Sequence, residues 1–159
     1  MSQVVFSTYD GRVAGYDLVL EENGLKFDMT INTQIGTSPV RALAFIKGNI
    51  FISNGTLVNK FNFETKRQVG SIQLKDRVDQ MLVMDGKLLV VHSYQADIYD
   101  PSTCDNLMSY KTGQHLITKA CVYAKNKFCL ACAGKLLAYC ANSSQPVAEM
   151  KIDDHITDM

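Results

Sequence analysis

The sequence has no tryptophan, only three prolines, no excess of either charge and no long apolar run. Sixteen lysines and arginines balance sixteen acidic residues, and no basic run is longer than two. Because binding to a phosphate backbone needs clustered positive charge, we expect no direct contact with nucleic acid. No stretch approaches the roughly 18 apolar residues of a membrane-spanning helix, so we expect no membrane span.

Cysteine is present in an odd number, five, in segments that look like buried strands. No leader with a basic start and an apolar centre precedes them. Because disulfides persist mainly in oxidising compartments, unpaired buried thiols favour a reducing one. The expected location is the cytoplasm, with the nucleus as the alternative.

The sequence also lacks the apolar spacing of an amphipathic helix, and shows short apolar runs between turn residues instead. Residues 3–18 contain two such runs around Asp10-Gly11. An Asp-Gly pair between β-favouring runs predicts a hairpin with a type I′ turn, in which both central residues have positive φ.

This hairpin recurs three more times, and each copy ends in an aromatic residue. The four closing aromatics are Tyr16, Phe61, Tyr99 and Tyr139. Their separations are 45, 38 and 40 residues. A period near 40 is typical of one blade of a β-propeller, a small sheet that buries its faces against neighbouring copies.

Two further strands accompany the hairpins. Apolar segments begin ahead of three of them, at Val40, Val78 and Ile117, and a more polar segment follows each, at 25–31, 69–74, 107–111 and 147–152. Residues 21–24 are the longest stretch expected to be irregular. The sequence therefore predicts an all-β fold, a propeller of four-stranded antiparallel blades. Residues 1–159 form one domain with repeats at 3–36, 39–75, 76–112 and 113–152.

The ends of the array leave two interpretations open. The first repeat lacks a leading strand, while residues 153–159 resemble the start of the fourth repeat and are predicted to form an extra leading strand. This strand could close a ring of four blades by completing the first repeat. Alternatively, the chain is part of a seven-bladed ring that a second chain completes.

The stretch STYDGRVAGYD at residues 7–17 resembles the WD-repeat family, in which Tyr16-Asp17 would stand at the Trp-Asp position. Residues 113–115, Gly-Gln-His, resemble the Gly-His element of that family, and residues 77–91 are similar to the divergent citron-homology type. The resemblance implies a propeller whose partners bind the loops before the first strand and between the second and third strands. Carried onto this chain, that face includes Arg12, Arg41, Arg77, Tyr94, His115 and Lys119.

Other candidate sites have structural explanations. Cys121, Cys129, Cys132 and Cys140 have a zinc-like spacing, but positions 129 and 132 of one strand point to opposite faces, so no metal or cofactor is expected. Cys121 and Cys129 are expected to be cross-strand neighbours. His92 lies inside an apolar strand, and His115 and His155 recur at the same position of the repeat. None of the three histidines therefore predicts catalysis.

Three functions fit these patterns. The first is a non-catalytic scaffold that presents propeller loops to other proteins in a complex. The second is the propeller segment of a vesicle-tethering or trafficking subunit. The third is a propeller-type enzyme with a site in the central channel, for which the leading strands offer only Arg41 and Asp79.

Overall fold

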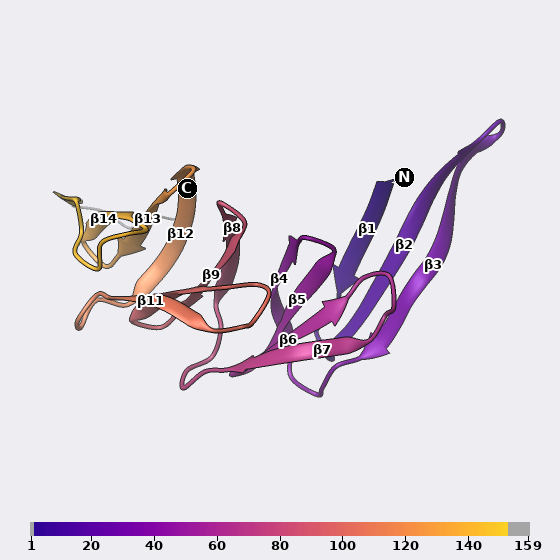
Figure 1. The fold of residues 1–159 in the computed structure, drawn as a ribbon, viewed down its shortest axis with the longest axis horizontal. Helices are drawn as coiled ribbons and strands as arrows, with labels where there is room; N and C mark the ends of the chain where they lie inside the picture. The colour runs from indigo at the N-terminus through magenta and orange to yellow at the C-terminus, as the bar shows by residue number, and fades with distance from the viewer. Residues whose placement is uncertain (1, 153–159) are drawn as a thin grey trace.

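A computed structural model describes residues 2–152 of the chain as fifteen strands in four antiparallel sheets, with no helix in this range (Figure 1). The all-β prediction is confirmed. Within every sheet, strands that follow one another in the sequence are neighbours. The predicted extra strand at 153–159 lies outside the described residues.

The first sheet has three strands and each of the others has four. Sheet 1 consists of β1 (Ser2–Ser7), β2 (Arg12–Glu21) and β3 (Gly24–Gln34). Sheet 2 consists of β4 (Val40–Ile46), β5 (Asn49–Asn54), β6 (Leu57–Asn62) and β7 (Gln68–Gln73). Sheet 3 consists of β8 (Gln80–Met84), β9 (Lys87–His92), β10 (Gln95–Tyr99) and β11 (Asn106–Lys111). Sheet 4 consists of β12 (Ile117–Ala124), β13 (Lys127–Cys132), β14 (Lys135–Cys140) and β15 (Ala148–Lys151).

The turns show where the sequence rules hold and where they fail. Lys47-Gly48 and Asp85-Gly86 have positive φ at both residues, as a type I′ turn requires. At Asp10-Gly11 the type I′ prediction is wrong, because only Gly11 has positive φ, at 82°. The Thr8 hydroxyl bonds both the Asp10 carboxylate and the Arg12 carbonyl, which holds a longer loop between Ser7 and Arg12.

The first sheet also differs from its predicted extent. Residues 21–24 were expected to be irregular, but only Glu22 and Asn23 form a turn. β2 and β3 pair without a break from Leu18 opposite Phe27 to Glu21 opposite Gly24. Lys26 lies 3.9 Å from Glu21 across this hairpin and 3.1 Å from Asp28 in its own strand. The pair of strands therefore projects beyond the other sheets (Figure 1).

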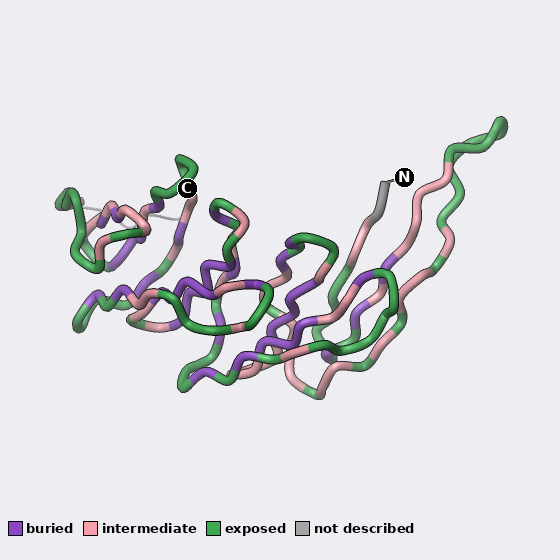
Figure 2. The backbone as a smooth tube through the Cα atoms, in the orientation of Figure 1, coloured by how far each residue is buried: buried purple, intermediate pink, exposed green. Residues whose placement is uncertain are grey.

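The core lies between successive sheets and not inside any one of them. Each of three buried apolar clusters joins two neighbouring sheets: sheets 1 and 2, sheets 2 and 3, and sheets 3 and 4. Figure 2 shows the buried residues along the strands, with most turns exposed. A β-sheet is stable only when its apolar face is covered, and here each sheet supplies the cover for the next.

The recurring aromatics explain the order of packing. Phe61, Tyr99 and Tyr139 each belong to the cluster shared with the preceding sheet. The contact between sheets 3 and 4 is the most aromatic. There the Tyr110 ring lies 4.9 Å from Phe128 and 5.1 Å from Tyr139, both edge to face, while Phe128 and Tyr139 stack at 5.4 Å. Such ring geometries add to the free energy of simple burial.

Candidate functional site

Backbone hydrogen bonds connect the loops on one edge of every sheet. In each sheet, the residue after the last strand donates a backbone hydrogen bond to the turn between the two strands that precede that last strand. The four bonds, of 2.9 to 3.0 Å, run from Ile35 N to Gly11 O, Leu74 N to Thr56 O, Thr112 N to Tyr94 O and Ile152 N to Gly134 O. We call these turns and loops, residues 8–11, 35–39, 55–56, 74–79, 93–94, 112–116 and 133–134, the loop edge. The same backbone hydrogen bond therefore anchors the loop edge in every sheet.

Two of the six predicted contact residues meet on this edge. The hydroxyl of Thr112 lies 2.9 Å from the carbonyl of Tyr94 and 2.5 Å from that of His115. The side chain of Tyr94 is 47% exposed, and His115 is also exposed. The backbone of both residues is therefore fixed, and their side chains are left accessible.

An ion pair connects two sheets at the same edge. The Arg41 guanidinium lies 3.6 Å from the Asp79 carboxylate, which also accepts a hydrogen bond of 3.2 Å from the backbone N–H of Ser93. Both charged side chains are about two-fifths exposed, at 43% and 39%. An exposed pair of this kind stabilises the fold by less than about 1 kcal/mol. Its main effect is to fix the position of Arg41 beside the turn that carries Tyr94.

The remaining three predicted residues lie on or beside the loop edge without such partners. Arg12 follows the first central turn, and its backbone N–H donates to the Thr8 hydroxyl at 3.1 Å. The side chains of Arg77 and Lys119 make no hydrogen bond or ion pair with any residue between 2 and 152. Arg77 is exposed and Lys119 is half-buried, so the Arg77 guanidinium is accessible and unpaired within residues 2–152.

A polar cleft that the sequence did not reveal lies between sheets 2 and 3. It measures about 370 Å³ and is lined by Gln73 to Asp76 on one side and by one face of β9, β10 and β11 on the other. At its base His92 Nε2 lies 2.7 Å from the carboxylate of Asp97, and both side chains are nearly buried, at 5% and 2% exposed. His92 and Asp97 are diagonal neighbours across the two-residue turn at 93–94.

The Asp97 carboxylate is ionised in spite of its burial. Burial raises its pKa, but hydrogen bonds from His92, Ser109 and Gln95 outweigh this effect and lower the pKa below its usual value. Because an ionised carboxylate only accepts hydrogen bonds, His92 Nε2 carries a proton. His92 Nδ1 is buried without a hydrogen-bond partner, 3.9 Å from the Asp76 carboxylate.

His92, Asp97 and Ser109 form a hydrogen-bonded cluster with a structural role. A nucleophile activated by histidine would have to reach the free ring nitrogen, yet the Ser109 hydroxyl bonds to Asp97 instead. His92, Ser109 and Gln95, from β9, β11 and β10, all donate to the Asp97 carboxylate. The sequence signal that could have identified the pair is a histidine and an aspartate flanking a two-residue hairpin turn.

The four cysteines with zinc-like spacing lie on both faces of sheet 4. No group of three or more metal-ligating side chains occurs among residues 2–152. Cys121 and Cys129 are paired across β12 and β13, as predicted, and no described cysteine is in a disulfide. Cys132 points the other way, into the core between sheets 3 and 4.

Burial makes the thiol of Cys132 unreactive. It is 5% exposed, and burial raises its pKa to about 11. Because the thiolate is the reactive form, we expect Cys132 to resist alkylation in the folded protein at about pH 8. Iodoacetamide labelling with peptide mass spectrometry measures this, and all five cysteines should react after unfolding in denaturant. Rapid labelling of Cys132 in the native protein would mean that sheets 3 and 4 separate.

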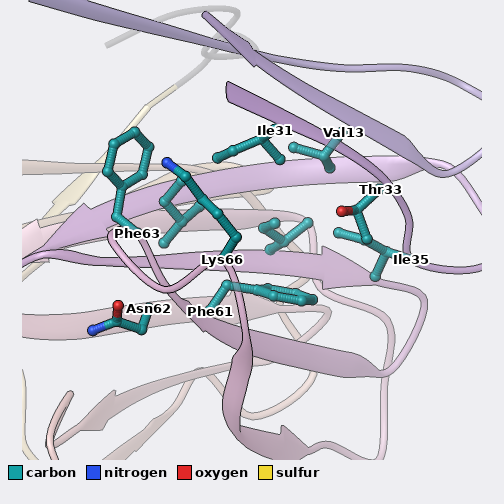
Figure 3. A pocket seen from close by; sticks show the side chains of 10 residues that line it. Val13, Ile31, Thr33, Ile35, Phe61, Asn62, Phe63 and Lys66 are labelled. Atoms are coloured by element: carbon teal, nitrogen blue, oxygen red, sulfur yellow. The ribbon is translucent and has the colours of Figure 1, made fainter. Parts of the chain in front are cut away.

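A second cavity, between sheets 1 and 2, is apolar and too small to bind a ligand (Figure 3). It measures about 20 Å³, which is close to the space occupied by one water molecule. The ammonium group of Lys66 covers it from above the ring of Phe63, 3.8 Å from the ring centroid. This cavity is a packing gap in the core.

Comparison with known proteins shows the fold alone. No family model matches the sequence, and no curated protein matches it. Among solved structures, the chain resembles the computationally designed protein Ika8, with a TM-score of 0.71 and 14% sequence identity. The similarity covers 94% of this chain and 59% of Ika8.

The described part of the chain contains no helix of the length and apolarity needed to cross a membrane.

Proposed function

We propose that the chain is a β-propeller segment of WD-repeat type and that its function is to hold other proteins at the loop edge, without catalysis. The observation that carries the proposal is the backbone hydrogen bond that recurs in all four sheets at this edge. Loops held in this way need little ordering when a partner binds, and ordering costs reduce affinity.

The chemistry of the edge supports the same proposal. Arginine and tyrosine are enriched among the residues that dominate binding energies at protein interfaces, and Arg77 and Tyr94 are both exposed here. The ion pair of Arg41 and Asp79 adds polar groups next to Tyr94. A partner with an acidic surface would match the unpaired Arg77.

The test is quantitative affinity purification of the chain from extracts of its own cells. Replacing Arg77 and Tyr94 with alanine should weaken retention of the specific partner about tenfold or more, because two interface anchors are lost. The matched control replaces Arg67 and Tyr123, which are exposed at the opposite edge of sheets 2 and 4, and should retain the partner. Equal retention by both variants would rule out the loop edge.

The two alternative functions make different predictions. A tethering or trafficking role would use the same edge, and its captured partners would be components of vesicle-tethering complexes. An enzyme would need a channel with ionisable groups, yet Arg41 and Asp79 neutralise one another and His92 is bonded to Asp97. We therefore favour the scaffold, located in the cytoplasm.

A further inference from the structure

The outer face of sheet 1 is apolar and uncovered by any residue between 2 and 152. Strand pairing places Phe6, Tyr16, Leu18 and Phe27 on the face opposite to Val5 and Val13, which pack on sheet 2. Its exposed side chains are Phe6 (52%), Leu20 (84%), Leu25 (52%), Phe27 (57%) and Met29 (55%). Three rings form edge-to-face contacts there, Phe6 with Tyr16 at 6.1 Å and Tyr16 with Phe27 at 6.5 Å. A contiguous apolar face of this kind marks an interaction surface.

The repeat identifies what covers such a face. Tyr16 is the closing aromatic of sheet 1, and its counterparts in the other sheets all pack on the preceding sheet. The face of Tyr16 thus corresponds to three faces that are each covered by an antiparallel sheet of the same kind. We therefore expect the face of Tyr16 to be covered by a sheet of the same kind, through the face that such a sheet turns toward the next one in the array.

Sheet 4 has a face of that type on which no other sheet packs within residues 2–152. Cys129 and Ala138 are paired on the side of sheet 4 that faces away from sheet 3, because their neighbours Phe128 and Tyr139 pack on sheet 3. Most side chains on this face are small or slender, namely Cys121, Cys129, Ala131, Leu136, Ala138, Cys140 and Met150, and Lys127 lies at its edge opposite Cys140. Ala131 is buried, Met150 is exposed and the others of this small set are half-buried. Large rings on one face and small residues on the other can interdigitate at the density of a protein core.

Sheets 1 and 4 stand at opposite ends of the arc, so within one chain these faces do not meet (Figure 1). We propose that a second copy of the chain covers them: sheet 1 of each copy packs on sheet 4 of the other, around a twofold axis. The resulting ring has eight sheets, at the upper end of the usual propeller range of about four to eight. This inference depends on the propeller arrangement proposed above, and it names the second chain that completes the ring.

Sedimentation equilibrium across a dilution series tests the proposal directly. The wild-type chain should have twice the mass of one copy. Phe27→Asp puts a charge in the centre of the sheet 1 face, and Ala138→Arg does the same on sheet 4, so each variant alone should be monomeric. Val69→Asp is the matched control, because Val69 is also 52% exposed but lies in sheet 2, and it should leave the dimer intact.

Mixing the two monomeric variants identifies which faces pair. The Phe27→Asp chain keeps an intact sheet 4 face and the Ala138→Arg chain keeps an intact sheet 1 face, so the mixture should form a dimer through one interface. Circular dichroism shows whether each variant is folded. A monomeric wild-type chain would overturn the proposal, and so would an Ala138→Arg variant that stays dimeric, because sheet 1 would then pack on itself.

The result can be separated from the test of the loop edge. The double alanine variant at Arg77 and Tyr94 lies outside both end faces and should sediment as a dimer. If this variant loses the partner but remains a dimer, the loop edge binds the partner and the end faces of sheets 1 and 4 form the dimer independently of it. If the wild-type chain is a dimer but captures no specific partner at the loop edge, the ring is supported and the scaffold is rejected.

Discussion

Replacing Tyr110 with alanine should lower the free energy of unfolding by about 3–5 kcal/mol, the range for deleting a buried aromatic side chain. Tyr110 is 0% exposed, and its hydroxyl donates to the carbonyl of Ala141 at 2.9 Å. Its ring comes from β11 and contacts Phe128 and Tyr139 of sheet 4. The substitution therefore opens a cavity at the contact between two sheets.

Thermal unfolding monitored by circular dichroism measures the effect, which corresponds to a loss of about 10 °C in Tm for a domain of this size. Tyr110→Phe keeps the ring and should cost only about 1 kcal/mol for the hydrogen bond. Tyr123→Ala is the matched control, since that side chain is 52% exposed, and it should change little. If Tyr110→Ala were as mild as Tyr123→Ala, sheets 3 and 4 would not share the aromatic core.

The second large effect is expected at Asp97. Removing its carboxylate with alanine should cost about 3–5 kcal/mol, because the buried or half-buried side chains of His92, Ser109 and Gln95 all lose their charged acceptor. Asp28→Ala removes an exposed carboxylate paired with Lys26 and should cost less than about 1 kcal/mol. Chemical denaturation of both variants and of the wild type gives the comparison.

The pH dependence has a definite sign. The pKa of Asp97 is lower in the folded state than the value of about 3.9 in unfolded chains, so its ionised form stabilises the fold above that pH. The contribution is lost as the pH falls through the folded pKa. The difference in unfolding free energy between wild type and Asp97→Ala should thus shrink below about pH 4. A difference that stayed constant down to acid pH would mean that the fold does not lower the pKa of Asp97.

The strands could be predicted because their information is local. Turn residues and the repeated closing aromatics Tyr16, Phe61, Tyr99 and Tyr139 fix hairpins that need no knowledge of the rest of the chain. Cys121 and Cys129 were placed opposite one another by counting back from a turn, and the register agrees. Alternation along a strand then separates the two faces of each sheet.

The sites could not be predicted because they depend on distances between sheets. The pairing of Arg41 with Asp79 joins residues of sheets 2 and 3, which no spacing within one repeat reveals. His92 looked like a structural residue of an apolar strand, and its bond to Asp97 requires the diagonal geometry of a hairpin. The turn at Asp10 was misjudged because the Thr8 hydroxyl competes with the Asp-Gly preference.

Cross-linking mass spectrometry of the chain bound to its captured partner tests most directly which edge the molecule uses. Lys75 and Lys119 lie on or beside the loop edge, whereas Lys47, Lys66 and Lys125 lie at the turns of the opposite edge. Cross-links to the partner should come from the first pair, even though Lys125 is 82% exposed and reacts readily. Cross-links concentrated at Lys47, Lys66 and Lys125 would contradict the account.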